Sequence, residues 1–193
     1  MKWNSLSRTF SHIVGFDDAP FPRDHRGGVS VVGAVYSGRR LEGVLTGRVC
    51  RDGDDGTGEL VRLVRDSKFA AHLQLVLLQG IALAGFNVID VPRLAAALGL
   101  PVLVVARRAP RREALRAALL AHIADGERKW ASIEALGPME PLGGVYVQRC
   151  GLSRDEAFRV LRETAIHGAI PEPLRTAHLI AGALATGESR GRT

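Results

Sequence analysis

The sequence has few cysteines and few aromatic residues. Its two cysteines, Cys50 and Cys150, lack Cys-x-x-Cys spacing. This gives little support to a disulfide framework or a zinc site, so we expect two reduced cysteines packed in the protein. Phenylalanine, tryptophan and tyrosine make up only 5% of the residues. The aromatic platforms that usually indicate base recognition are therefore missing.

Long apolar runs are also absent. No stretch is long enough to span a bilayer, and residues 1–5 lack the apolar core of a signal peptide. We therefore expect a cytoplasmic protein with no membrane partner. A chain of 193 residues suits one domain, which we place at 1–193 with residues 1–11 and 187–193 mobile.

Acidic residues are outnumbered by basic ones. The formal net charge is +6 and the pI is about 10.1, which favours an anionic partner such as DNA or RNA. The densest basic cluster consists of Arg107, Arg108, Arg111, Arg112 and Arg116. These arginines could bind successive phosphates of a nucleic acid. A helix face exposed to solvent would explain their charge equally well.

Hydrophobic periodicity predicts an α/β domain. Strands are expected at residues 12–18, 29–36, 41–49, 73–78, 101–106 and 145–148. Helices are expected at 59–71, 90–99, 111–125, 128–136, 153–161 and from 171 onward. The first three strands form antiparallel hairpins and βα units follow. This order predicts a ribonuclease H-like mixed β-sheet flanked by helices on both faces.

Two carboxylates, Asp17 and Asp18, end the first strand. Adjacent strand residues point to opposite faces, so if Asp17 faces a site, Asp18 faces away and caps the following turn. Turn chemistry before Pro20 is the simpler explanation of the pair. In the expected sheet, however, the end of the first strand lies beside the end of the fourth. Asp17 and the region of Gln79 should therefore be neighbours.

Four segments together resemble domain-of-unknown-function family 99. They are residues 15–21, the Asp52-Gly53-x-Asp55 loop, residues 79–90 and residues 170–178. That family in turn looks like a distant relative of endonuclease V, with which it shares Gly-x-Asp on the first strand and the Pro-Glu-Pro-x-Arg-x-Ala start of the last helix. The resemblance implies a phosphodiesterase dependent on Mg²⁺ or Mn²⁺ that nicks DNA or RNA near a deaminated base such as hypoxanthine or uracil.

The resemblance also assigns residues. Asp17 matches the first metal-binding aspartate, and His178 falls where the last helix supplies a residue facing the site. Arg107 follows the fifth strand, where the resemblance implies an active-site lysine, and it matches that lysine only by its place in the order of elements. Arginine can bind phosphate bidentately but cannot act as a base. Gln79 stands where an Asp is expected, and a neutral amide coordinates Mg²⁺ only weakly. Replacement acids are available at Glu172 and at the Asp54-Asp55 pair.

The other candidate site residues can also be explained by a role in the fold. Substrate contacts are expected from Gly80, Gly85 and Asn87 in the loop after the fourth strand, and from Arg175. Asn87 also suits a loop-ordering amide, and His178 on an apolar helix face suits a core histidine. The Asp52–Thr57 loop has faintly calcium-like spacing but lacks the distal Glu of such loops, and is closer to a turn.

Three hypotheses follow. The first is a metal-dependent nuclease in which Asp17 and Gln79 hold the cation while Arg107 and His178 steady charge. The second is a non-catalytic nucleic-acid-binding protein that kept the fold and lost the metal through Gln79. The third is a protein-interaction or small-ligand module that uses the loop from Gly80 to Asn87.

Overall fold

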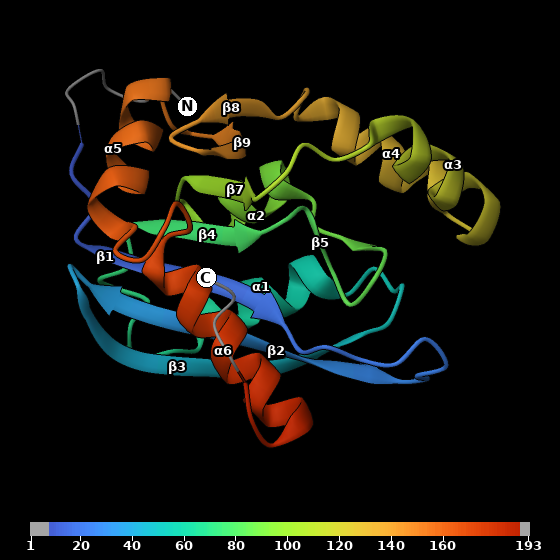
Figure 1. Ribbon diagram of the computed structural model, residues 1–193, viewed down its shortest axis with the longest axis horizontal. Coiled ribbons are helices and arrows are strands. Elements are labelled where there is room, and N and C mark those ends of the chain that lie inside the picture. Colours follow the sequence, from blue (N-terminus) through green and yellow to red (C-terminus); the bar gives the residue numbers. More distant parts are fainter. Residues whose placement is uncertain (1–7, 190–193) are drawn as a thin grey trace.

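The computed structural model describes residues 8–189, and residues 1–7 and 190–193 lie outside this part of the chain. The described residues form a seven-stranded sheet with helices on both faces, and a separate two-stranded sheet (Figure 1). The strands are β1 (His12–Asp18), β2 (Gly28–Ser37), β3 (Arg40–Cys50), β4 (Leu75–Gln79), β5 (Ala82–Leu83), β6 (Asn87–Val88), β7 (Val102–Ala106), β8 (Glu140–Leu142) and β9 (Val145–Cys150). The helices are α1 (Gly56–Arg65), α2 (Val91–Leu98), α3 (Arg112–His122), α4 (Gly126–Ala135), α5 (Arg154–Thr164) and α6 (Glu172–Thr186).

The order of strands in the large sheet is β3-β2-β1-β4-β7-β9-β8. The first three strands are antiparallel, β4 and β7 run parallel to β1, and β9 is antiparallel to β7. This confirms the predicted mixed sheet of three antiparallel strands followed by βα units. The short edge strand β8 and the separate hairpin of β5 and β6 were not predicted from the sequence.

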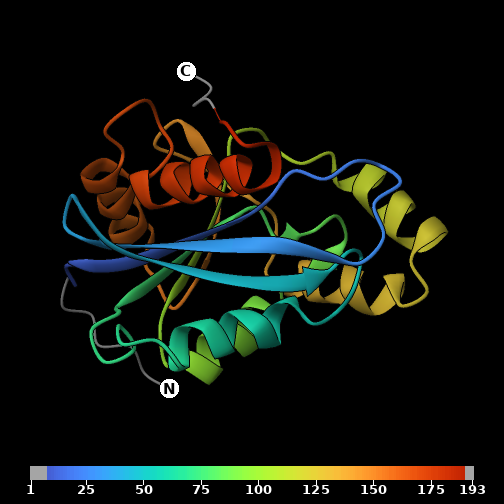
Figure 2. The same ribbon diagram turned by 90° about the horizontal axis from the view of Figure 1, so that it is seen from below.

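Alternate residues of the central strands point to opposite faces of the sheet, and each face packs into its own hydrophobic layer. Val14, Phe16 and Leu78 face one layer, together with residues of α1 and α2. Ile13 and Leu77 face the other, together with residues of α5 and α6. Figure 2 shows α1 and α2 below the sheet and α5 and α6 above it. Burial on both faces explains why β4 and β7 are continuous apolar runs.

Capping residues in the sequence determine where several helices begin and end. The Asp90 side chain accepts the backbone N–H of Arg93 at 3.0 Å, and Gly99 ends α2 in the left-handed conformation. Ser153 and Glu156 form the predicted capping box of α5. Glu156 also forms a 2.9 Å ion pair with Arg8, and Phe10 is buried. Residues 8 and 10, in a segment expected to be mobile, are thus packed on the domain.

Helix α1 differs from its predicted bounds. We expected residues 59–71, but α1 begins at Gly56 and ends at Arg65. Its start is stabilised because Asn87 accepts the N–H of Gly56 at 3.0 Å, a tertiary contact that the local sequence does not reveal. After Arg65, the hydroxyl of Ser67 donates a hydrogen bond to the carbonyl of Val64, and the helix ends there. Cys50 and Cys150 are both free thiols, but Cys50 is exposed rather than packed.

Helix α6 crosses directly over β1. A Cβ atom at Gly15 would lie 2.6 Å from the backbone carbon of Pro173, so only glycine permits this approach. The close contact places the next turns of α6 above the end of β1. In the described part of the chain, residues 8–189, no helix is long and apolar enough to cross a membrane.

Candidate nuclease site

The candidate site lies at the carboxyl ends of β1, β4 and β7. Phe16 pairs with Leu78, so the next residues, Asp17 and Gln79, lie side by side on the face covered by α6. Gln79 in turn pairs with Val105 of β7. The predicted proximity of Asp17 and Gln79 is therefore confirmed. In open α/β sheets the carboxyl ends of parallel strands are the usual place for a ligand.

Asp17 and His178 form the polar centre of the site. The Asp17 carboxylate is only 5% exposed, and its Oδ2 lies 2.8 Å from Nδ1 of His178 on α6. Its Oδ1 accepts the backbone N–H of Asp18 at 3.0 Å. The side chain of His178 is 52% exposed. A histidine that donates Nδ1–H to a carboxylate has Nε2 as its remaining proton acceptor, so this contact orients the His178 ring as a candidate base.

The open space beside this pair is a cavity of about 910 Å³. Its polar lining comes from β4, from the segment after β7, from α6 and from the residues just after α6. It includes Gln79, Gly80, Arg107, Arg108, Arg175, His178, Thr186, Glu188 and Ser189. The Oε1 atom of Gln79 is buried and has no hydrogen-bond partner among the described residues. A buried polar atom without a partner is costly, which makes Gln79 Oε1 the best candidate to bind a ligand in this cavity.

Arg175 and Glu172 pair with each other at the start of α6. The Arg175 guanidinium donates to Glu172 through Nε at 2.8 Å and Nη2 at 2.6 Å, and Glu172 raises the pKa of Arg175. Glu172 is 5% exposed. The carboxylate considered as a replacement acid is thus already neutralised by Arg175, which lines the cavity as half of an ion pair.

Asp18 points to the other face of the sheet, as predicted, but its partner is different from the one expected. Its Oδ2 accepts the backbone N–H of Ala84 at 3.0 Å, a residue of the loop after β4, instead of capping the turn that follows β1. Burial, together with the neighbouring Asp17 carboxylate, raises the pKa of Asp18 to about 6. Because its pKa is raised, ionisation of Asp18 as the pH rises through about 6 destabilises the folded chain.

The loop residues Gly85 and Asn87 lie apart from the cavity lining. Asn87 is fully buried, and its amide donates to the carbonyl of Cys50 and to Asp55 while its oxygen accepts from Gly56. Gly85 has φ +87°, and a Cβ atom there would lie 2.4 Å from Asp52. These contacts give both residues a structural role in the loop. They were expected to bind substrate, whereas Gly80, also expected there, does line the cavity.

The carboxylates of the acidic loop after β3 bind other groups of the protein. Asp55 accepts the N–H of Cys50 at 3.0 Å and pairs with Asn87. Asp54 lies 3.5 Å from Arg128, and Asp52 accepts the N–H of Phe86. Within residues 8–189, no group of three or more His, Cys, Asp or Glu side chains is arranged to hold a metal ion.

Lys129 is a residue that the sequence analysis missed. It is 2% exposed, and its ammonium donates to the carbonyls of Asp52 at 2.8 Å, Gly53 at 2.7 Å and Phe86 at 2.9 Å. This side chain on α4 thus ties the loop after β3 to the loop between β5 and β6. Its sequence neighbours, Arg128 and Trp130, gave no sign that this lysine is buried.

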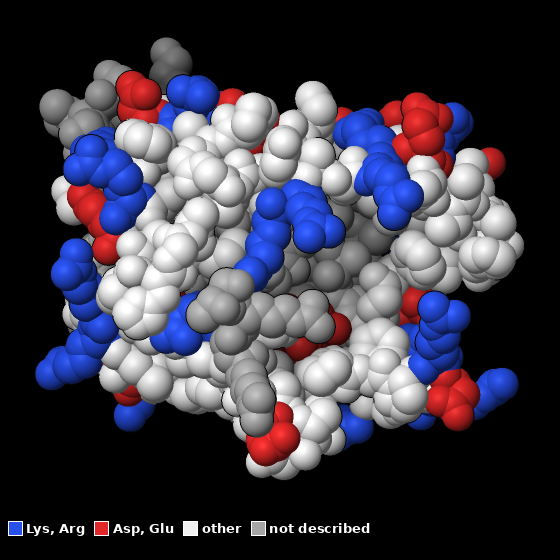
Figure 3. Space-filling model, in the orientation of Figure 1, with Lys and Arg blue, Asp and Glu red and all other residues white. Residues whose placement is uncertain are grey.

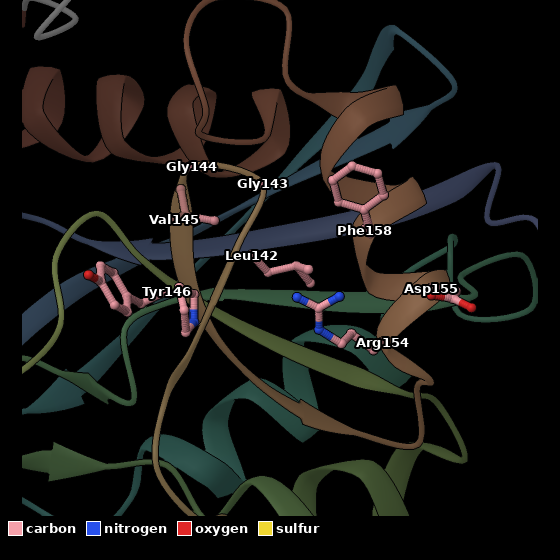
Figure 4. A pocket seen from close by; sticks show the side chains of 9 residues that line it. Leu142, Gly143, Gly144, Val145, Tyr146, Arg154, Asp155 and Phe158 are labelled. Atoms are coloured by element: carbon pink, nitrogen blue, oxygen red, sulfur yellow. The ribbon is translucent and has the colours of Figure 1, made fainter.

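A second hollow of about 480 Å³ lies at the edge of the sheet formed by β9 and β8. It is bounded by the turn between β8 and β9 and by the first turns of α5 (Figure 4). Arg154 points toward Leu142 in this view, and Asp155 points away from it. Arg154 is ion-paired with Glu140 at 3.6 Å, and Phe158 is 39% exposed. None of the predicted site residues lines this hollow.

Comparison with solved structures defines the class of fold. The chain is similar to endonuclease V of Ciona intestinalis in complex with DNA containing an inosine, with a TM-score of 0.58 and 13% identity over 87% of this chain and 83% of that one. At this identity the likeness shows the fold alone. The mixed sheet with its flanking helices is thus of the endonuclease V type.

Sequence comparison defines the family. A family model described as endonuclease dU matches residues 9–185, and the chain belongs to this family. A UPF0215 protein of Deinococcus radiodurans is 58% identical over 94% of this chain and 93% of its own length. A solved protein of unknown function from Archaeoglobus fulgidus has a TM-score of 0.83 and 35% identity over 90% of this chain and 97% of that one.

Proposed function

We propose that this protein is a metal-dependent endonuclease that cleaves phosphodiester bonds of DNA or RNA near a deaminated base. The observation that carries the proposal is the pairing of buried Asp17 with His178 beside the unpartnered Oε1 of Gln79, at the strand ends of an endonuclease V fold. The family description, endonuclease dU, and the inosine in the DNA of the Ciona complex support a deaminated base as the feature recognised.

The residues at the site fit a divalent cation such as Mg²⁺ or Mn²⁺. Asp17 and Gln79 supply a carboxylate and an amide oxygen on neighbouring strands, and the amide oxygen lacks any other partner. Magnesium sites commonly use one or two carboxylates and complete the shell with water and substrate phosphate. When bound there, the cation would supply Lewis-acid polarisation of the scissile phosphate.

The remaining residues have roles that need no cation. His178 lines the cavity and is oriented by its contact with Asp17, which suits it to accept or deliver a proton during phosphodiester hydrolysis. Arg107 and Arg108 follow β7 and line the same cavity, where guanidinium groups bind phosphate oxygens bidentately. Arg175 contributes a positive charge that is already shared with Glu172.

The proposal is tested by a cleavage screen. Oligonucleotides that carry uracil, hypoxanthine or an abasic site, as single and double strands of DNA and RNA, are incubated with the protein in Mg²⁺, Mn²⁺ or EDTA. We expect cleavage of at least one modified substrate, dependent on the cation and abolished by EDTA, with unmodified oligonucleotides as controls. Cleavage that persists in EDTA, or no cleavage of any substrate with either cation, would contradict the proposal.

The alternative function is non-catalytic nucleic-acid binding by the same fold. It is favoured by the neutral amide of Gln79 and by the lack of a group of three metal-ligating side chains in residues 8–189. Binding to the same oligonucleotides in EDTA, without cleavage when Mg²⁺ or Mn²⁺ is added, would identify this function.

The substitution Gln79→Asp tests where the cation binds. A carboxylate 4 Å from a unit charge is stabilised by about 4 kcal/mol at an effective dielectric of 20. Desolvation and repulsion from Asp17 offset much of this gain. We expect Mn²⁺ affinity, measured by calorimetry, to rise at least about tenfold, or about 1.4 kcal/mol. Gln79→Asn, which matches the shape of aspartate without its charge, is the control, and equal affinities for the two variants would exclude position 79 from the cation site.

A further inference from the structure

The loop between β1 and β2 carries a group of basic residues that the proposed active site does not use. The loop leaves β1 immediately after Asp17 and Asp18, so it begins at the same end of the sheet as the candidate site. Arg23 and Arg26 in this loop are exposed. No hydrogen bond or ion pair within the described residues occupies either guanidinium group.

Arg51 holds this loop in a defined conformation. Its guanidinium donates through Nη1 to the carbonyls of Arg23 at 2.5 Å and His25 at 2.9 Å, and through Nε to Asp52 at 3.1 Å. It also lies 5.5 Å from the ring of Phe21. Because Arg51 binds the loop through its backbone, the side chains of Arg23 and Arg26 remain available. Together with Arg51, His25 and the carboxylates of Asp24 and Asp52, they line a hollow of about 490 Å³.

A second basic group lies on the other side of the site. Strand β4 separates β1 from β7, so residues that follow β7 lie across Gln79 from the loop that follows β1. Arg108 and Arg111 precede α3 and Arg116 lies within it, and all three are exposed. Figure 3 shows Lys and Arg side chains gathered over the start of α3 and over the tip of the β1–β2 loop, on either side of a hollowed region.

We propose that the β1–β2 loop, through Arg23 and Arg26, is a second binding surface for the sugar-phosphate backbone of the nucleic acid on which the site acts. This inference rests on the proposed function and names the part of the protein that holds the flanking nucleotides. A strand bound at Gln79 meets the arginines near α3 on one side and the arginines of the loop on the other. Phosphates are the partner because the hollow is lined by three guanidinium groups against two carboxylates, and by no apolar side chain of the described residues.

The test is the salt dependence of binding, measured in EDTA by fluorescence anisotropy with labelled single-stranded and duplex oligonucleotides. Three double variants are compared with the native protein. They are Arg23→Gln/Arg26→Gln in the loop, Arg111→Gln/Arg116→Gln near α3, and the control Arg39→Gln/Lys68→Gln. Arg39 and Lys68 are exposed and lie at the opposite ends of β2 and β4, so the control removes the same charge far from the site.

Each lost phosphate contact lowers the slope of log affinity against log salt by about 0.9 on duplex DNA and about 0.7 on single strands. We therefore expect the slope of the loop variant to be shallower than the native slope by roughly 1.8 on a duplex, or by roughly 1.4 on a single strand, because two contacts are removed. The α3 variant should lose a similar amount, and the control should keep the native slope. Circular dichroism confirms that each variant is folded.

Two results would overturn this inference and leave the proposed function standing. In the first, the loop variant keeps the native slope while the α3 variant loses part of it. In the second, all three variants lose the same amount, which would mean that only total charge matters. If the native protein does not bind in EDTA, the inference also fails, and the cleavage screen in Mg²⁺ and Mn²⁺ then decides the proposed function independently.

Discussion

Replacement of Asp17 by asparagine is expected to lower the rate of phosphodiester cleavage by about 10³-fold or more, which corresponds to about 4 kcal/mol in the activation free energy. Asparagine has the shape of aspartate and can still accept the N–H of Asp18. It removes the negative charge that faces His178 and the only carboxylate we assign to the cation. The measurement is kcat/KM on the best substrate from the cleavage screen, with Mn²⁺ binding followed by calorimetry.

Asp18→Asn is the matched control for this experiment. It removes the same charge from the adjacent residue, but Asp18 faces the other side of the sheet and binds the backbone of Ala84. We expect its rate to remain within about tenfold of the native value, because asparagine can still accept that hydrogen bond. Equal losses in the two variants would indicate a general charge effect, and full activity of Asp17→Asn would remove Asp17 from catalysis.

Replacement of Lys129 by methionine is expected to lower the free energy of unfolding by about 3 kcal/mol. Methionine fills a similar volume but leaves the carbonyls of Asp52, Gly53 and Phe86 without their shared donor. Hydrogen bonds to charged groups contribute about 1.5–3 kcal/mol each, and an orphaned buried acceptor is costly. Urea unfolding followed by circular dichroism measures the change, and the midpoint temperature should fall by roughly 6–12 °C.

Lys68→Met controls for the loss of a lysine. Lys68 is exposed and lies 5.2 Å from the ring of Phe69, so its replacement should change the unfolding free energy by no more than about 0.5 kcal/mol. If Lys129→Met changes stability as little as Lys68→Met, the three carbonyls do not depend on the ammonium. A large loss at Lys129 alone would confirm that this side chain holds the two loops together.

The strands and several helix ends were predictable because their causes are local. Apolar runs bounded by Gly and Pro identified β4 and β7, and Asp90 and Ser153 identified helix starts by their capping chemistry. The start of α1 and the short strands β5 and β6 were not predictable in this way. They depend on contacts made by Asn87 and on pairing within a loop, which only the folded chain brings together.

The site was predictable in part. Strand order alone placed Asp17 beside Gln79, and the resemblance to endonuclease V pointed to His178. The burial of Lys129, the pairing of Arg175 with Glu172 and the internal use of Asn87 were not visible, since each depends on the direction of a side chain in three dimensions. The sequence also gave no sign that Asp18 reaches Ala84 on a distant loop.

The contact between Asp17 and His178 joins residues that are 161 positions apart in the sequence. Because synthesis proceeds from the N-terminus, Asp17 is made long before α6, the last helix within residues 8–189. Contacts of such long sequence separation form late in folding, because the entropy of closing a large loop must be overcome first. A nascent chain therefore carries the carboxylate without its histidine until nearly the whole domain has been synthesised.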